Sequence, residues 1–308
     1  MDVTKFVQVC LNGLTLGSLY ALIALGYTLV YGVLRFINFA HSDVVTIGAW
    51  MAFVFAAAIG WAGTDSPLFA MPVILAMSMA VCATLGFTIE RLAYRPLRRA
   101  PRLNVLITAI GVSLFLQNSG QLKWVFGTQP QAMPKLLSEE ALFTLAGVRV
   151  PVVDVVVVVL AFTLLVALQW LVFRTRMGQA MRAVSFDERT AALMGINVDM
   201  IISYTFMIGS ALAAAGGMIY GLKYGNLLQS ADSVWVLLGL KAFVAAVVGG
   251  IGNVRGAVAG AFLIAFVEMF GAAYRSPQMR DVYVFGILIA VLILKPGGLL
   301  GKATVEKV

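Results

Sequence analysis

Four polar side chains lie close together in the stretch Phe36–Trp50, which is otherwise largely apolar: Asn38, His41, Ser42 and Asp43. Such groups cost on the order of several kcal/mol if they face lipid, so they must face protein, water or headgroups. One interpretation is an unwound or half-helical element whose polar groups line a path for a solute. The other is a polar turn in which Ser42 or Asp43 caps the next helix. The sequence leaves both open.

A second polar group follows the glycine-rich stretch Gly249–Gly252. It contains Asn253 and Arg255, and Lys241 lies in the apolar run that precedes them. Paired interruptions in two halves of a chain are typical of transport proteins, so Asn253 is a further candidate for the pathway. No residue-level repeat is visible, and internal symmetry remains a hypothesis.

Lys241 and Glu268 are ionisable residues in otherwise apolar runs, and Asp232 precedes the first of these runs. Groups of this kind can couple transport to protons or sodium, or form a structural ion pair. We favour the structural pair.

Catalytic patterns are absent from the sequence. His41 is the single histidine, which excludes an H-E-x-x-H metal site, and no G-x-S-x-G nucleophile motif occurs. The stretch Gly297–Thr304 lacks the first glycine of a phosphate-binding loop, and Ala303 replaces its Ser or Thr. We therefore predict no catalytic residue, no metal and no bound cofactor. If transport is driven, the energy comes from another protein.

Residues 174–197 form a basic, helix-prone segment between two apolar runs. Its polar side holds Arg182, Asp187, Glu188 and Arg189. Its apolar face is predicted to comprise Ala180, Met181, Val184, Ala191, Ala192 and Met194. Gly195 and Asn197 are predicted to end the helix. We interpret this segment as a docking surface for a soluble partner. The alternative is a connecting helix that lies on the membrane surface.

The elements that position these residues are predicted from composition. The 308 residues are 61% hydrophobic and 12% charged, against about 25% charged in soluble domains. A membrane-spanning helix needs roughly 20 apolar residues. Apolar runs occur at 6–34, 43–62, 68–90, 103–120, 151–173, 200–222, 234–250, 256–274 and 282–295. The predicted fold is all-α: a single transmembrane domain over 1–308, a helix bundle with about eight or nine membrane segments. The stretches 35–50 and 234–256 are candidates for broken or re-entrant helices.

Basic residues set the predicted orientation. They cluster at 91–102, at 174–189 and in the tail, and the positive-inside rule places these regions in the cytoplasm. The clusters comprise Arg91, Arg95, Arg98, Arg99, Arg102, Arg174, Arg176, Arg182, Arg189, Lys295, Lys302 and Lys307. The connection 121–150, where Glu139 and Glu140 oppose the basic residues, then lies outside. The N-terminus is predicted outside and the C-terminus inside. The net charge of +8 is read as a topology signal, with no nucleic-acid partner.

Three stretches together resemble a known family. FINFAHSDVVTIGAW, MRAVSFDERTAALMGINVDMIISYTFMIGSALAAAGGMIYG and AVVGGIGNVRGAVAGAFLIAFVE are similar to the permeases of branched-chain amino acid ABC importers, LivH type. The resemblance covers nearly the whole chain. It implies a second, LivM-like permease subunit, two cytoplasmic ATPase subunits that bind the ATP, and a periplasmic substrate-binding protein. It also implies the bacterial inner membrane. Relatives import urea, amides or other amino acids, and an ion-coupled secondary transporter is the main rival class.

Two departures from the family pattern matter. The resemblance makes 174–197 the coupling segment that seats on an ATPase, where ABC importers often carry an EAA-x3-G pattern. Here Thr190–Gly195 has Thr for Glu and one residue fewer before Gly, so the role of the segment carries over and its individual contacts do not. Ser42 stands where the family string FxNFAHGD has Gly, which leaves close backbone packing there open.

Overall fold

The structure is a computed structural model that describes residues 3–61, 69–98, 100–137, 141–145 and 147–301. Some residues used in the orientation argument lie outside this part of the chain: Arg99, Glu139, Glu140, Lys302 and Lys307. Each apolar run predicted from the sequence is a helix, with ends within a few residues of the prediction. These helices are α1 (Val3–Leu34), α2 (His41–Ile59), α3 (Ala70–Ile89), α4 (Arg102–Gly120), α5 (Val152–Arg174), α8 (Val198–Tyr224), α9 (Ser233–Gly249), α10 (Val254–Tyr274) and α11 (Arg280–Leu294).

Eight helical stretches in the described residues are long and apolar enough to cross a membrane. The helix α9 has 17 residues, or about 25 Å at 1.5 Å per residue, slightly less than the roughly 30 Å hydrocarbon core. It packs antiparallel to α10, because Ala245 lies against Gly260 and Gly249 against Gly256. The stretch 234–256 is therefore an uninterrupted helix, a tight turn and the start of the next helix.

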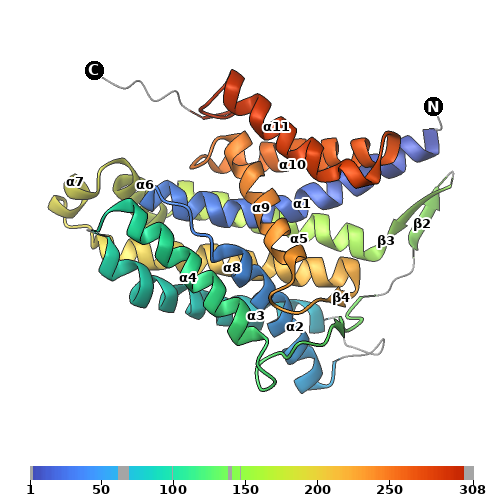
Figure 1. Ribbon diagram of the computed structural model, residues 1–308, viewed down its shortest axis with the longest axis horizontal. Helices are drawn as coiled ribbons and strands as arrows, with labels where there is room; N and C mark the ends of the chain where they lie inside the picture. The colour runs from blue at the N-terminus through green and yellow to red at the C-terminus, as the bar shows by residue number, and fades with distance from the viewer. Residues whose placement is uncertain (1–2, 62–68, 99, 138–140, 146, 302–308) are drawn as a thin grey trace.

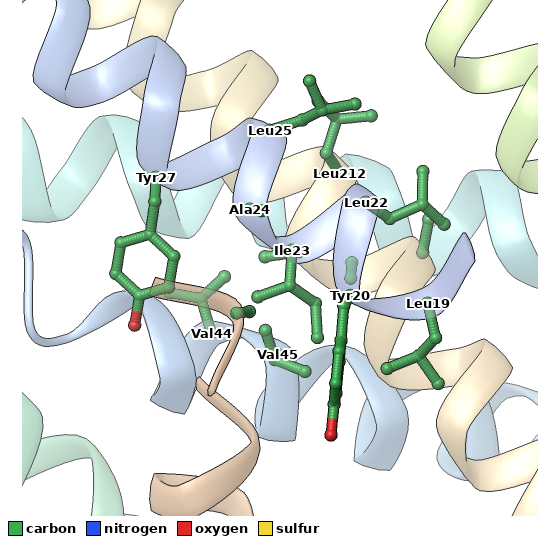
Figure 2. Close-up of a cluster of buried hydrophobic side chains, with 14 of the residues drawn as sticks. Leu19, Tyr20, Leu22, Ile23, Ala24, Leu25, Tyr27, Val44, Val45 and Leu212 are labelled. Carbon is green, nitrogen blue, oxygen red and sulfur yellow. The ribbon is translucent and has the colours of Figure 1, made fainter. Parts of the chain in front are cut away.

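The core is built around α1, which is buried over most of its length between α8, α9 and α10. Figure 2 shows Ile23 of α1 with Val44 and Val45 of α2 in the cluster of buried side chains. The α2 and α8 backbones approach closely: a Cβ on Gly217 would lie 1.9 Å from the Val45 carbonyl oxygen. The small residues of α8 thus permit the tight helix packing expected from the sequence.

The helices α4, α5 and α11 form part of the outer surface. They expose large apolar side chains such as Phe115 (71%), Trp170 (64%) and Ile293 (75%). Lipid tails are as apolar as these side chains, so such a surface is stable in a bilayer although it would not be in water. The outer surface of large apolar side chains and the buried centre of small residues together fit a polytopic membrane protein.

One end of the molecule carries short strands (Figure 1). β2 (Ala141–Leu145) and β3 (Val148–Pro151) form an antiparallel hairpin, and β1 (Gln131–Ala132) pairs with β4 (Asn226–Leu227). The sequence analysis did not predict these strands. The start of α1 lies here too, since Gln8 exchanges two hydrogen bonds with the backbone of Arg149. We call this the hairpin end.

The opposite end carries the short helices α6 (Arg176–Phe186) and α7 (Glu188–Leu193) (Figure 1). The π-helical turn η1 (Glu90–Tyr94) and the 3-10 turn η2 (Arg95–Leu97) follow α3. Arg95 and Arg98 both bind Asp199, near the start of α8. The residues after α11 return to α9, because the Leu299 amide donates to the Val248 carbonyl. A further 3-10 turn, η3 (Pro277–Met279), precedes α11. The structure thus gathers the predicted cytoplasmic regions at one end.

Candidate functional site

The helix α2 begins deep inside the protein. Residues 35–40, here called the interrupted segment, are not helical, and Arg35 has a φ of 53°, which is uncommon for a residue with a side chain. The His41 ring then lies against Gly26 of α1, and its Nε2 is 3.2 Å from the Ile23 carbonyl oxygen. Because Gly26 precedes Leu34 by eight residues, α2 begins about 12 Å in from the end of α1. The chain therefore doubles back along α1 before α2 starts.

The four polar side chains of this region are buried, with exposures of 1–6%. Each contacts a different element. The Tyr94 hydroxyl donates to Asn38 Oδ1 over 2.6 Å, and Gln117 Nε2 of α4 donates to Asp43 Oδ1 over 2.9 Å. The Ser42 hydroxyl donates to the Phe39 carbonyl. Of the two alternatives that the sequence left open, the one in which Ser42 or Asp43 caps the helix is wrong: Ala40 occupies that position and makes no side-chain cap. The physical reason is that the chain turns inward before the helix begins, so these side chains point into the packed interior.

Ser42 packs directly against α9. A Cβ on Gly239 would lie 2.2 Å from Ser42 Cβ, so only glycine fits opposite this serine. The helices α2 and α9 thus approach closely with Ser42 on α2, because the facing residue on α9 is a glycine.

One carboxylate oxygen of Asp43, Oδ2, is buried and has no hydrogen-bond partner among the described residues. An unpaired buried acceptor of this kind is costly, and a donor such as water or an ammonium group would satisfy it. An open, largely apolar cleft of about 370 Å³ lies between α2, α3 and α4, and Asp43 does not line it. Ile47, one turn after Asp43, and Leu116, which adjoins Gln117, line this cleft.

Asn253 lies apart from this group. Its side chain caps α10 by accepting from the Arg255 and Gly256 amides, and it donates to the Leu300 carbonyl over 2.9 Å. The adjoining Gly252 packs against Gly32 of α1, so the two interruptions meet through backbone and not through their polar side chains. Asn253 therefore stabilises the turn between α9 and α10.

Lys241 and Glu268 form a buried ion pair of 2.7 Å. Glu268 also accepts from the Tyr20 hydroxyl over 2.8 Å, and Lys241 contacts Asp281 over 2.8 Å. The group ties α1, α9, α10 and α11 together. Asp232, the third ionisable candidate, caps α9 by accepting from the Val234 amide.

The coupling segment is two helices and not one. The chain breaks at Asp187, whose side chain caps α7 by accepting from the amides of Arg189 and Thr190. Hydrogen bonds from the Thr190 hydroxyl and from these amides lower the pKa of Asp187. Gly195, with a φ of 83°, follows α7 as predicted. The prediction that Asn197 also ends this helix is wrong. Its side chain instead caps α8, because it accepts from the Met200 amide.

The surface of the coupling segment differs in part from the prediction. Met181, Val184 and Ala191 face inward, but Ala192 is exposed, because the break at Asp187 reorients α7. Glu188 and Arg189 are exposed, as expected. Three large apolar side chains are almost fully exposed: Phe186 (89%), Leu193 (88%) and Met194 (79%).

Arg182, which was predicted on the polar side of the segment, contacts the end of α5. Its Nη1 donates to the Val172 carbonyl near the end of α5, and its guanidinium lies 5.5 Å from the centre of the Phe173 ring. This arginine joins α6 to α5, which the sequence pattern did not indicate.

Sequence reasoning missed Tyr94 and Gln117, the partners of Asn38 and Asp43. Gln117 could have been noticed, because it is a polar residue within an apolar run. Tyr94 carries no comparable signal, since an aromatic residue near the end of such a run is common.

Eight helices of membrane-spanning length in the described part of the chain, with buried polar groups at the start of α2, define a polytopic membrane protein. The family model of branched-chain amino acid transport system permease components matches residues 9–292, and the chain belongs to this family. It is 42% identical to the high-affinity branched-chain amino acid transport system permease protein BraD of Pseudomonas aeruginosa, over 100% of this chain and 99% of that protein. It is 39% identical to the LivH permease proteins of Salmonella typhimurium and Escherichia coli, over 98% of both chains in each comparison.

Proposed function

We propose that this chain is one permease subunit of an ATP-driven ABC importer for branched-chain amino acids in the bacterial inner membrane. It pairs with a second, LivM-like permease subunit, and a periplasmic binding protein delivers the substrate. Two cytoplasmic ATPase subunits bind and hydrolyse the ATP, so the chain itself carries no catalytic residue, metal or cofactor. Alternating exposure of the pathway to the two sides then moves the substrate.

The observation that carries this proposal is the exposed apolar group Phe186, Leu193 and Met194 on the coupling segment. Large exposed apolar side chains beside exposed charged ones, here Glu188 and Arg189, are typical of protein interaction sites. Asp187, whose side chain is exposed, caps α7, which ends at Leu193 and is followed by Met194. An ATPase subunit that seats on α6 and α7 would bury them.

The substrate class is supported by the region around Asp43. A branched-chain amino acid carries an ammonium group and an apolar side chain. The unpaired Asp43 Oδ2 can accept from an ammonium group, and the cleft between α2, α3 and α4 is largely apolar. The path needs few charged side chains, because the substrate is a small zwitterion with an apolar side chain. Much of the selection among substrates falls to the binding protein.

The orientation follows from the two ends of the molecule. The α6–α7 end holds Arg95, Arg98 and Arg176, and the positive-inside rule favours the cytoplasmic side for such a basic end. The N-terminus and the connection 121–150 are then outside, and the C-terminus is inside.

Reconstitution tests the proposal. The chain is co-expressed with its genomic neighbours, and the purified complex in proteoliposomes is given labelled leucine with the binding protein. We expect uptake that needs ATP and stops when the ATPase active site is inactivated. Uptake by this chain alone, driven by a proton or sodium gradient, would instead establish a secondary transporter. Preferential uptake of urea or an amide would change the substrate class and leave the ATP-driven class intact.

A further inference from the structure

The coupling segment touches the interrupted segment directly. The Ser185 hydroxyl of α6 donates to the Gly32 carbonyl in the last turn of α1. In return, Arg35 Nη2 donates to the Ser185 carbonyl over 3.2 Å. One residue of the coupling segment thus holds both sides of the point where α1 stops being helical.

A second chain of contacts reaches the same segment from its other side. Asp199 lies in the first turn of α8, directly after the coupling segment, and binds Arg95 and Arg98. Arg98 also binds Glu90, which is fully buried and accepts from Ser203 of α8. The start of α8 is therefore tied by charged groups to the π-helical turn η1.

That π-helical turn ends at Tyr94, whose hydroxyl donates to Asn38 Oδ1. The Tyr94 side chain is buried, and its ring packs against Phe36 and Phe206. The start of α8 is thus connected to the interrupted segment through a packed aromatic ring and one hydrogen bond.

Two features of this region are uncommon backbone conformations. Arg35 occupies the left-handed region, at a φ of 53°, and η1 has π-helical hydrogen bonding. π-helical turns inside α-helices occur frequently at functional sites. Both lie where the contacts from the coupling segment arrive.

We propose that the interrupted segment is the element through which ATPase movement reaches the solute path, and that Ser185 and Tyr94 are its positioning residues. Ser185 holds the Gly32–Arg35 end and Tyr94 holds Asn38, three residues before His41. Movement of α6 and of the start of α8 shifts the start of α2, and with it Asp43. This inference rests on the proposed function, because it requires an ATPase on the coupling segment.

The test separates ATP hydrolysis from uptake. Ser185→Ala and Tyr94→Phe are each assembled with the ATPases and binding protein in proteoliposomes. We expect normal yield of the complex and retained ATP hydrolysis, with leucine moved per ATP reduced on the order of fivefold or more, the lower range of typical coupling effects. Ser185→Thr, which keeps the hydroxyl, should restore most of the ratio.

Matched controls remove the same groups elsewhere. Tyr204→Phe changes a partly exposed tyrosine of α8, and Thr163→Val removes a hydroxyl that bonds only within α5. Both should leave the ratio unchanged. The inference is overturned if both test variants keep the wild-type ratio, or if yield, hydrolysis and uptake fall together, which would indicate a purely structural role. Absence of ATP-dependent uptake by the wild-type complex would instead refute the proposed function.

Discussion

Replacement of Lys241 by Met tests whether the buried ion pair is structural. The side chains of Lys241 and Glu268 are 9% and 5% exposed, so loss of the lysine leaves the Glu268 charge buried without its counter-ion. Removing one member of a buried pair costs about 3–5 kcal/mol. For a chain of about 300 residues this corresponds to a fall in Tm of roughly 5–10 °C. The double variant Lys241→Met with Glu268→Gln should regain most of the loss, because the Tyr20 hydroxyl keeps an acceptor and no charge is stranded.

The chain carries its own reporter for this measurement. Cys82 is fully buried, so a thiol-reactive dye detects it only on unfolding. Cys10, which is partly exposed, is first replaced by Ala to remove background. The matched control is Asp281→Asn, since Asp281 is 48% exposed and its contact with Lys241 is worth at most about 1 kcal/mol.

Two results would refute this reasoning. One is a Lys241→Met variant with the wild-type Tm, and the other is a double variant no more stable than the single one. The same double variant bears on mechanism. If the pair is structural, the double variant still imports leucine in the assembled complex. A transporter that couples ions through Glu268 would instead lose uptake entirely.

Three further predictions concern the coupling segment and the start of α2. Arg189→Glu should lower co-purification of the ATPases severalfold without reducing membrane insertion, and recovery of ATPase at wild-type yield would contradict it. Because the folded pKa of Asp187 is lowered, its cap on α7 is fully present above the unfolded value near 3.9 and is lost as pH falls through the folded value. The protection factors of the α7 amides, which correct each exchange rate for its intrinsic dependence on pH, should therefore fall in that acidic range and stay constant with Asp187→Asn. Gly239→Ala should destabilise the chain by about 1–3 kcal/mol through overpacking, and Ser42→Gly should rescue it, as measured by Tm.

The sequence predicted the bundle well because a bilayer imposes a simple rule. A helix must satisfy its own backbone and present some 20 apolar residues, and this rule can be read from composition. The segment 174–197 was also recognisable, because charge in a short loop stands out against apolar runs. The all-α architecture and the family membership are confirmed.

The details that depend on distant contacts were not predictable. The return of residues 35–40 along α1 has no periodic signal, and neither does the pairing of Asn38 with Tyr94, 56 residues away. The break at Asp187 was missed because an N-cap aspartate and a solvent-exposed aspartate look alike in sequence. That break decides which face α7 presents, so the exposure of Leu193 and Ala192 could not be derived either.

The length of α1 has a consequence for communication across the membrane. Its 32 residues span about 48 Å, well beyond the hydrocarbon core. Near its start Gln8 is bonded to the hairpin, and in its last turn Gly32 is bonded to α6. Binding equilibria linked through one rod obey reciprocity. In the importer proposed above, an external protein that tilted α1 would change the affinity of α6 for the ATPase, and the ATPase would change the affinity of the hairpin end by the same factor.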